Sequence, residues 1–186
     1  MRGTRTGLSI FLVISLFSLT SATARDAERP SEGDTAPDVT LLNQWGESVA
    51  LADLWAAGPV IVYFYPKDFT PSCTAQALDF RDAGPELQAA GLTVVGISIN
   101  TVGSHRRFAE TYHLDFEVLS DVGARAAEAF GVKKADHGFV IARRSTFLID
   151  QGGEIVWIWD PAQPRKHVET VMAEAQRLQI GGFAQP

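Results

Sequence analysis

The chain has 186 residues, of which 46% are hydrophobic and 20% are charged. This length and composition indicate one globular domain, large enough to bury its own core, plus a short additional segment. The formal net charge is −6 and the basic residues are scattered, which argues against a nucleic-acid-binding role. A single cysteine excludes both an intramolecular disulfide and a cysteine-rich zinc site.

The first 24 residues have the three parts of a secretory signal peptide. Arg2 and Arg5 form a basic start, an almost wholly apolar run covers residues 8–19, and Ala-Thr-Ala at residues 22–24 supplies a cleavage motif. The apolar run is shorter than the roughly 20 residues that a membrane-spanning helix needs. An uncleaved anchor is the alternative that the sequence leaves open. We therefore expect an exported, periplasmic protein without stable membrane insertion after cleavage of residues 1–24.

The segment that follows the leader differs in composition from the rest of the chain. Residues 25–35 are polar and contain proline and glycine, which indicates a flexible lead-in. The folded domain is expected over residues 36–180, and residues 181–186 are expected to form a C-terminal tail.

The domain is expected to begin with two short strands joined by a turn at residues 43–48. Residues 60–65 (VIVYFY) and 92–98 (LTVVGIS) are continuous apolar runs, typical of strands that are buried on both faces. A helix is expected between them, over residues 72–89. This order of strand, helix and strand predicts a right-handed βαβ unit with parallel strands.

Helices and strands continue to alternate toward the C-terminus. The remaining elements are expected at residues 103–113 (helix), 116–119 (strand), 124–130 (helix), 146–149 (strand), 155–159 (strand) and 168–178 (helix). Residues 133–138 are expected to form a loop. Together these elements predict an α/β protein with a central mixed sheet and helices on both faces.

The residues after the strand at 60–65 place the only cysteine at the start of a helix. Thr70 is a good N-cap residue and Pro71 suits the first helical position, so that Cys73 falls in the first turn. Unpaired backbone N–H groups and the helix dipole favour an anion there, and a thiolate is such an anion. The Thr70 hydroxyl is expected to bond the sulfur and an incoming substrate oxygen, and Pro66 is expected to shape the loop and shield the thiol.

Cys73 also has a purely structural interpretation. Cysteine is among the most frequently buried residue types, and a small apolar side chain at a helix start would give the same pattern. Three features favour a reactive thiol instead. They are the helix N-terminus, the loop of proline, threonine and proline, and the expected oxidising compartment, where structural cysteines are usually paired.

The spacing Pro66-x-x-x-Thr70-x-x-Cys73 resembles the active-site signature of the peroxiredoxins. The run YPKDFTPSCT, with the DFRD that follows it, is similar to the bacterioferritin-comigratory, or PrxQ-type, branch of the AhpC/TSA superfamily. Residues 33–54 resemble the opening strands of that family and residues 144–150 its late strand. The resemblance covers nearly all of the expected mature chain and implies a thioredoxin-like fold.

The resemblance also implies an antioxidant peroxidase and a role for each matching residue. Cys73 matches the peroxidatic cysteine, which attacks hydrogen peroxide or a small organic hydroperoxide and becomes a sulfenic acid. Thr70 matches the residue that orients the peroxide, and Arg144 matches the arginine that stabilises the thiolate and the developing negative charge. A cation beside a thiolate stabilises it on general grounds as well. The neighbouring Arg143 is expected at the surface, and no metal or cofactor is expected.

Two positions depart from the family pattern. Many relatives carry a resolving cysteine five residues after the first, where this chain has Leu78. The chain therefore resembles a one-cysteine variant that needs an external thiol, from a thioredoxin-like protein or a small molecule, and that acts as a monomer or homodimer. A glutamate often found three residues after the cysteine is Gln76, which is expected to keep a hydrogen bond to an arginine but to lose the charge pairing.

Three other functions stay open on the sequence alone. A thiol–disulfide oxidoreductase of thioredoxin type needs a Cys-x-x-Cys pair, and Thr70 occupies the first position of that pattern. A cysteine hydrolase would need catalytic partners such as His137 and Asp150, and no local sequence pattern supports that role for them. A non-catalytic thioredoxin-fold binding module is excluded by no feature of the sequence, and only activity separates it from the enzyme.

Overall fold

A computed structural model of the chain describes residues 29–160 and 166–182. The predicted signal peptide, residues 25–28 of the lead-in and residues 183–186 of the tail therefore lie outside the described residues. Within the described ranges, no helix has the length and apolar character needed to cross a membrane.

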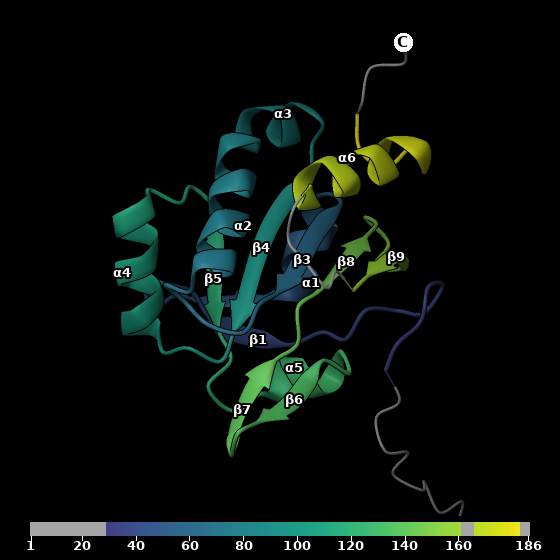
Figure 1. Cartoon of the computed structure of the whole chain (residues 1–186). Helices are drawn as coiled ribbons and strands as arrows, with labels where there is room; N and C mark the ends of the chain where they lie inside the picture. Colours follow the sequence, from purple (N-terminus) through teal and green to yellow (C-terminus); the bar gives the residue numbers. More distant parts are fainter. Residues whose placement is uncertain (1–28, 161–165, 183–186) are drawn as a thin grey trace, which may run out of the picture.

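A seven-stranded mixed sheet forms the centre of the protein (Figure 1), and its strand order is β2-β1-β5-β4-β3-β8-β9. The strands β3, β4 and β5 run parallel, whereas β1, β2, β8 and β9 pair antiparallel with their neighbours. The strands are β1 (Thr40–Leu42), β2 (Ser48–Ala50), β3 (Val60–Phe64), β4 (Thr93–Ser98), β5 (Glu117–Ser120), β8 (Ser145–Ile149) and β9 (Ile155–Trp159). The expected α/β class and the parallel βαβ unit are confirmed.

Helices cover both faces of this sheet, as the sequence predicts. They are α1 (Leu51–Ala57), α2 (Pro71–Asp82), α3 (Gly84–Ala89), α4 (Val102–Tyr112), α5 (Arg125–Ala129) and α6 (His167–Arg177). The helix expected over residues 72–89 is divided into α2 and α3 because Pro85, near the start of α3, has no N–H to continue the hydrogen bonds of α2.

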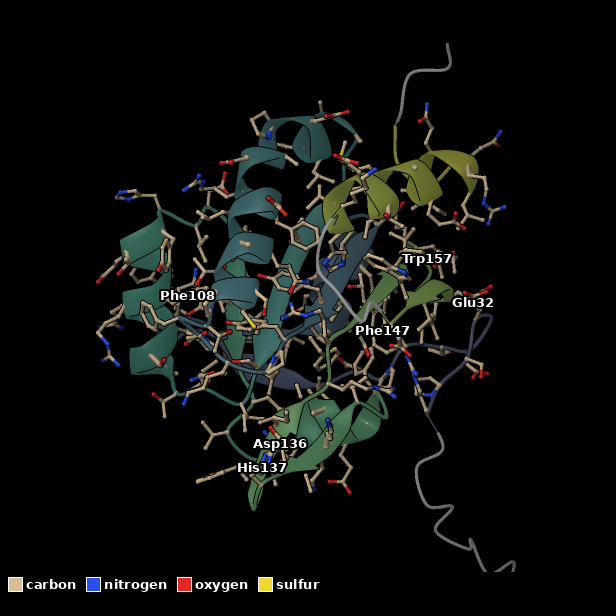
Figure 2. The ribbon with its side chains drawn as sticks, viewed as in Figure 1. Glu32, Phe108, Asp136, His137, Phe147 and Trp157 are labelled. Atoms are coloured by element: carbon tan, nitrogen blue, oxygen red, sulfur yellow. The ribbon has the colours of Figure 1, made fainter. Side chains whose placement is uncertain are left out.

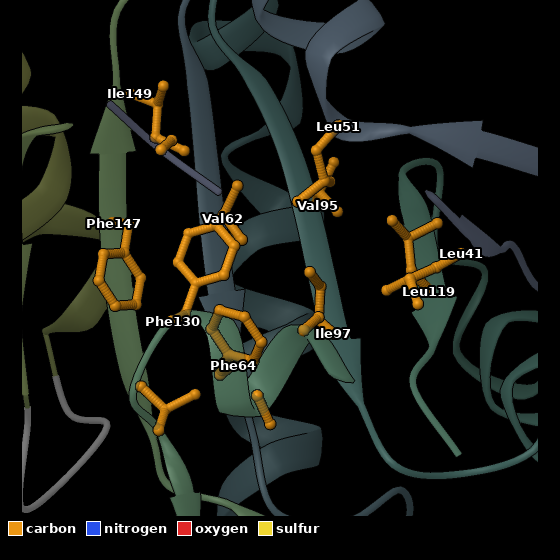
Figure 3. Close-up of a cluster of buried hydrophobic side chains, with 14 of the residues drawn as sticks. Leu41, Leu51, Val62, Phe64, Val95, Ile97, Leu119, Phe130, Phe147 and Ile149 are labelled. Atoms are coloured by element: carbon orange, nitrogen blue, oxygen red, sulfur yellow. The ribbon is translucent and has the colours of Figure 1, made fainter. Parts of the chain in front are cut away.

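The alternation of side chains along β3 divides the core into two layers. Val62 and Phe64 point to the layer that contains α1 and α5, part of which Figure 3 shows. Ile61 and Tyr63 point to the opposite layer, which contains α2, α4 and α6. All five residues of β3 are fully buried, which is the reason that its sequence is apolar without alternation. The catalytic candidate Cys73 belongs to the second layer.

The prediction of a loop at residues 133–138 is wrong, because most of this segment belongs to a second, two-stranded sheet. β6 (Lys133–Asp136) and β7 (Phe139–Ala142) pair antiparallel around a turn at His137 and Gly138, whose φ values of 46° and 84° are both left-handed, as a tight hairpin turn requires. The strand residues are largely exposed and lack the apolar alternation that identifies a strand in sequence. β7 leads directly into Arg143 and Arg144, which precede β8. Figure 1 shows the chain passing from β7 to β8.

The described part of the predicted lead-in contacts the domain well before Ala36. The backbone N–H of Gly33 donates to the carbonyl of Ile155 at 2.8 Å, and the N–H of Ile155 donates to the carbonyl of Asp34 at 2.9 Å. Glu32 accepts a hydrogen bond from the N–H of Ile158 at 3.0 Å (Figure 2). Residues 29–35 therefore cover the outer edge of β9, which would otherwise present unpaired backbone groups.

Arg29 fixes the start of this N-terminal segment. Its guanidinium binds both carboxylate oxygens of Asp160, with distances of 2.5 and 2.7 Å, and lies 5.7 Å from the ring centre of Phe147. Its backbone and side-chain stem pack directly against Gly131, so that a Cβ at that position would overlap them. Asp160 also accepts a hydrogen bond from Ser145 at 2.5 Å, at the start of β8.

We expect Gly131→Ala to destabilise the protein more than Gly138→Ala. Both glycines have a left-handed φ, so that alanine costs about 1 kcal/mol or more at either position. Only at Gly131 does the new methyl group also overlap Arg29, which adds about 1–3 kcal/mol. Urea unfolding of the two variants measures the difference. Equal losses of stability would contradict the tight packing of the N-terminal segment.

Candidate active site at Cys73

Cys73 lies where the sequence predicts it, in the first turn of α2. Thr70 is the N-cap residue with an extended backbone (φ −79°, ψ 144°), and Pro71 is the first helical residue. Cys73 is thus the third residue of the helix and is 2% exposed. The first-turn N–H groups have no carbonyl partners within the helix, and together with the helix dipole they stabilise negative charge on the sulfur.

Arg144 supplies a positive charge at the sulfur. Its Nη2 lies 3.1 Å from Cys73 Sγ and 3.2 Å from Ser72 Oγ, although the arginine and the cysteine are 71 residues apart in the chain. A guanidinium at this distance stabilises a thiolate over a thiol. Arg143, by contrast, is exposed and lies 3.7 Å from Asp160, so that the structure separates the two neighbouring arginines as expected.

The Thr70 hydroxyl does not bond the sulfur, which corrects part of the prediction. It donates instead to the backbone carbonyl of Lys67 at 3.0 Å, within the loop that joins β3 to α2. The hydroxyl oxygen keeps its capacity to accept a hydrogen bond from a substrate. Pro66 is half-buried in the same loop.

A buried carboxylate that sequence analysis missed holds this loop in place. Asp68 is 3% exposed and accepts hydrogen bonds from Tyr65 at 2.7 Å and Ser104 at 2.6 Å, while His105 Nδ1 lies 3.1 Å from it. Burial alone would raise the pKa of Asp68, but the bonds from His105, Ser104 and Tyr65 lower it below its ordinary value. The carboxylate therefore stays charged and ties the loop to α4.

The loop also contains an unusual backbone conformation. Phe69 follows Asp68 with a φ of 60°, which a bulky residue rarely adopts. Its ring packs against Phe108 and Tyr112 of α4. The contacts of both residues fix the loop immediately before Cys73. A sequence signal that could have indicated them is His105, which falls on the same face as Phe108 and Tyr112 in the helix predicted over residues 103–113.

A second buried group, His167, lies on the same side of the sheet. Gln76 was expected to bond an arginine, but no hydrogen bond joins it to Arg144. Its side-chain nitrogen instead lies 2.5 Å from Nδ1 of His167. The other ring nitrogen of His167 lies 2.7 Å from Thr146 Oγ1. Burial first, and the charge of Arg144 second, lower the pKa of His167 to about 3. No sequence pattern singled out this histidine.

The residues of the hydrolase alternative lie elsewhere. His137 is at the exposed tip of the β6–β7 hairpin, where it contacts Asp136 at 3.0 Å (Figure 2). Asp150 binds the backbone N–H groups of Gly152 and Glu154 in the turn between β8 and β9. Neither residue bonds Cys73, so that the geometry gives a cysteine hydrolase no support.

The pattern of the AhpC/TSA family matches residues 32–158 of the chain, which include the loop, Cys73 and Arg144. The chain belongs to the AhpC/TSA family. This match, together with the named relatives and solved structures that follow, confirms the sequence-based resemblance to peroxiredoxins and the thioredoxin-like fold.

Relatives of known name place the chain in the peroxiredoxin Q branch. It is similar to the chloroplastic peroxiredoxin Q of Oryza sativa subsp. japonica, with 38% identity over 87% of this chain and 75% of the relative. It is also similar to the putative peroxiredoxin bcp of Coxiella burnetii, with 40% identity over 75% of this chain and 95% of the relative.

Solved structures agree with this placement. The peroxidoxin BcpB of Mycobacterium tuberculosis is similar with a TM-score of 0.75 and 33% identity, over 79% of this chain and 97% of that structure. A cysteine-to-serine mutant of Xylella fastidiosa PrxQ is similar with a TM-score of 0.76 and 28% identity, over 82% of this chain and 99% of that structure. This peroxiredoxin differs from a two-cysteine pattern at Leu78, which is half-buried in α2.

Replacing Arg144 by alanine should make the Cys73 thiolate harder to form. Loss of the charge 3.1 Å from Sγ is expected to move the midpoint of the pH dependence of iodoacetamide alkylation to higher pH. Arg144→Lys should give a smaller shift, since it keeps the charge but not the planar donor group. Arg143→Ala is the matched control and should leave the midpoint unchanged. A midpoint that is the same in wild type and Arg144→Ala would remove Arg144 from the site.

The lowered pKa of His167 predicts sensitivity to acid. The unfolded chain takes up a proton near the ordinary pKa of 6.5, whereas the folded protein does so only near about 3, so that stability decreases as the pH falls through this window. The expected loss from this group between about pH 7 and pH 4 is on the order of 3 kcal/mol. Urea unfolding across this range should show a shallower decrease for His167→Gln, which cannot titrate. Parallel pH profiles for both proteins would contradict the prediction.

Proposed function

We propose that this peroxiredoxin reduces hydrogen peroxide or a small organic hydroperoxide through Cys73 and is returned to its thiol form by an external thiol. The observation that supports this most directly is the contact of 3.1 Å between Arg144 and the sulfur at the first turn of α2, in a chain of this family. The burial of Cys73 favours a small substrate group at the reacting atom.

The oxidative step uses the groups around the sulfur as follows. The thiolate attacks one peroxide oxygen, an S–O bond forms while the O–O bond breaks, and the leaving oxygen takes up a proton to become water or an alcohol. Sulfur is oxidised to the sulfenic acid and the peroxide is reduced. Negative charge moves from sulfur to the oxygens in this step, so that the Arg144 guanidinium and the first-turn N–H groups stabilise both the thiolate and the transition state.

Returning the Cys73 sulfenic acid to the thiol requires thiols from outside this chain. The sequence has no second cysteine, and Leu78 occupies the position where many relatives carry one. A first external thiol condenses with the sulfenic acid and releases water, which leaves a mixed disulfide. A second thiol attacks this disulfide and frees Cys73. A thioredoxin-like protein or a small thiol fits this role.

Cys73→Ser should abolish peroxidase activity while preserving the fold, because serine is nearly isosteric but is not a comparable nucleophile. The wild-type protein, treated briefly with about one equivalent of peroxide in the presence of a sulfenic-acid trap, should gain the mass of one trap molecule at Cys73. Retained activity in Cys73→Ser, or an inert Cys73 in the wild type, would refute the peroxidase. An inert thiol would also indicate a binding module that has kept only the shape of the site.

We further propose that residues 1–24 direct export and that the protein works in the periplasm. The support is the basic start, the apolar run and the cleavage motif of the sequence. Full-length protein expressed in a Gram-negative bacterium should appear in the periplasmic fraction, with an intact mass that begins at Arg25. A variant with the apolar run interrupted by two aspartates should stay in the cytoplasm. A mass that includes residues 1–24 in the membrane fraction would indicate an uncleaved anchor instead.

A further inference from the structure

His167 joins the two elements that carry the reacting groups. It is the first residue of α6 and is fully buried. One ring nitrogen lies 2.5 Å from the Gln76 amide and the other lies 2.7 Å from the Thr146 hydroxyl. Gln76 follows Cys73 by three residues in α2, and Thr146 follows Arg144 by two residues in β8. One ring nitrogen thus contacts a residue close in sequence to Cys73, and the other contacts a residue close in sequence to Arg144.

The positions of Gln76 and Thr146 in their helix and strand link His167 to both Cys73 and Arg144. Residues three apart in a helix share a face, so that Gln76 lies on the side of α2 that carries Cys73, and both are buried. Thr146 is also fully buried and belongs to the strand that begins one residue after Arg144. A neutral imidazole has one donor and one acceptor. It satisfies both contacts at once when the Gln76 amide donates to Nδ1 and the Nε2–H donates to Thr146.

Aromatic side chains hold the imidazole ring in this position. Its centroid lies 4.7 Å from the Trp159 ring and 5.0 Å from the Phe80 ring, and it stands perpendicular to the Tyr63 ring at 6.4 Å. These rings come from β9, α2 and β3 respectively. The histidine therefore cannot rotate without disturbing the packing between α2 and the sheet.

Arg144 has few contacts of its own that would fix its position. Within the described residues its guanidinium bonds only Ser72 and Cys73, and its Nη1 is buried without a hydrogen-bond partner. No carboxylate of these residues forms a salt bridge with it. The distance between guanidinium and sulfur therefore depends on how α2 is placed against the start of β8.

We propose that His167 is a positioning residue of the peroxidase site, which sets the placement of α2 against β8 by bonding Gln76 and Thr146 simultaneously. This placement keeps the guanidinium of Arg144 in contact with the sulfur. The role rests on the proposed function, because it assigns His167 to the same reaction.

The test compares His167→Phe, which keeps an aromatic ring but removes both hydrogen bonds, with Thr146→Val, which removes one bond at nearly constant shape. Two measurements are made on each folded variant: the pH dependence of Cys73 alkylation by iodoacetamide, and the rate constant of Cys73 oxidation by hydrogen peroxide. In both variants the alkylation midpoint should move to higher pH, and oxidation should slow by about 5- to 20-fold, as expected for the loss of one or two buried hydrogen bonds. His167→Gln, which can bond both partners, should recover part of the rate.

A double variant and a control sharpen the result. His167→Phe combined with Thr146→Val should be no slower than His167→Phe alone, because both substitutions remove the same bond. His113→Asn is the matched control. His113 is exposed, with a left-handed φ of 52° at the end of α4 that asparagine tolerates, and its replacement should leave both measurements unchanged.

Two outcomes would overturn the inference. The first is a folded His167→Phe or Thr146→Val variant with the alkylation midpoint and oxidation rate of the wild type, which would make the network structural only. The second is strict additivity of the two substitutions. If His167→Phe does not fold, Thr146→Val alone decides the question. If the wild type does not react with peroxide, the proposed function fails, whereas the alkylation measurement still tests the role of His167.

Discussion

The pairing of β8 with β3 is the constraint on which the site depends. Phe64, the last residue of β3, pairs with Ser145, the first residue of β8. The chain leaves β3 through the loop that leads to Cys73, and it enters β8 from Arg144, so that this register places the guanidinium beside the sulfur. A slip by one residue would turn every side chain of β8 to the other face of the sheet and would break the contact.

Two buried polar networks then hold the helix start from opposite sides. Asp68 binds the loop before Cys73 to α4, and His167 binds the helix after Cys73 to β8 and α6. Buried polar groups are costly unless they are paired, and for this reason such networks select one arrangement of the surrounding elements. The two histidines face opposite charges. His105 lies against a carboxylate, whereas His167 lies near a guanidinium and is held neutral by burial.

The absence of a second cysteine changes what the site must do after oxidation. A resolving cysteine in α2 would form a disulfide within the chain, but Leu78 occupies that position. Under the proposed function the sulfenic acid then reacts with a thiol from outside the chain, although Cys73 is only 2% exposed. The contacts that stabilise the Cys73 thiolate also restrict access to it.

The sequence by itself determined the features that depend on short-range patterns. The apolar run of β3, the threonine cap and Pro71 defined the start of α2, and they placed Cys73 in its first turn. Arg144 was identified through the family resemblance, because nothing local distinguishes it from Arg143.

Tertiary structure alone decided which distant groups meet. Gln76 turned from the expected arginine to His167, which is 91 residues away, and Thr70 turned from the sulfur to Lys67. The β6–β7 hairpin and the docked N-terminal segment also escaped prediction. Their stability comes from turn geometry and from contacts with β9, neither of which leaves a periodic pattern in the chain.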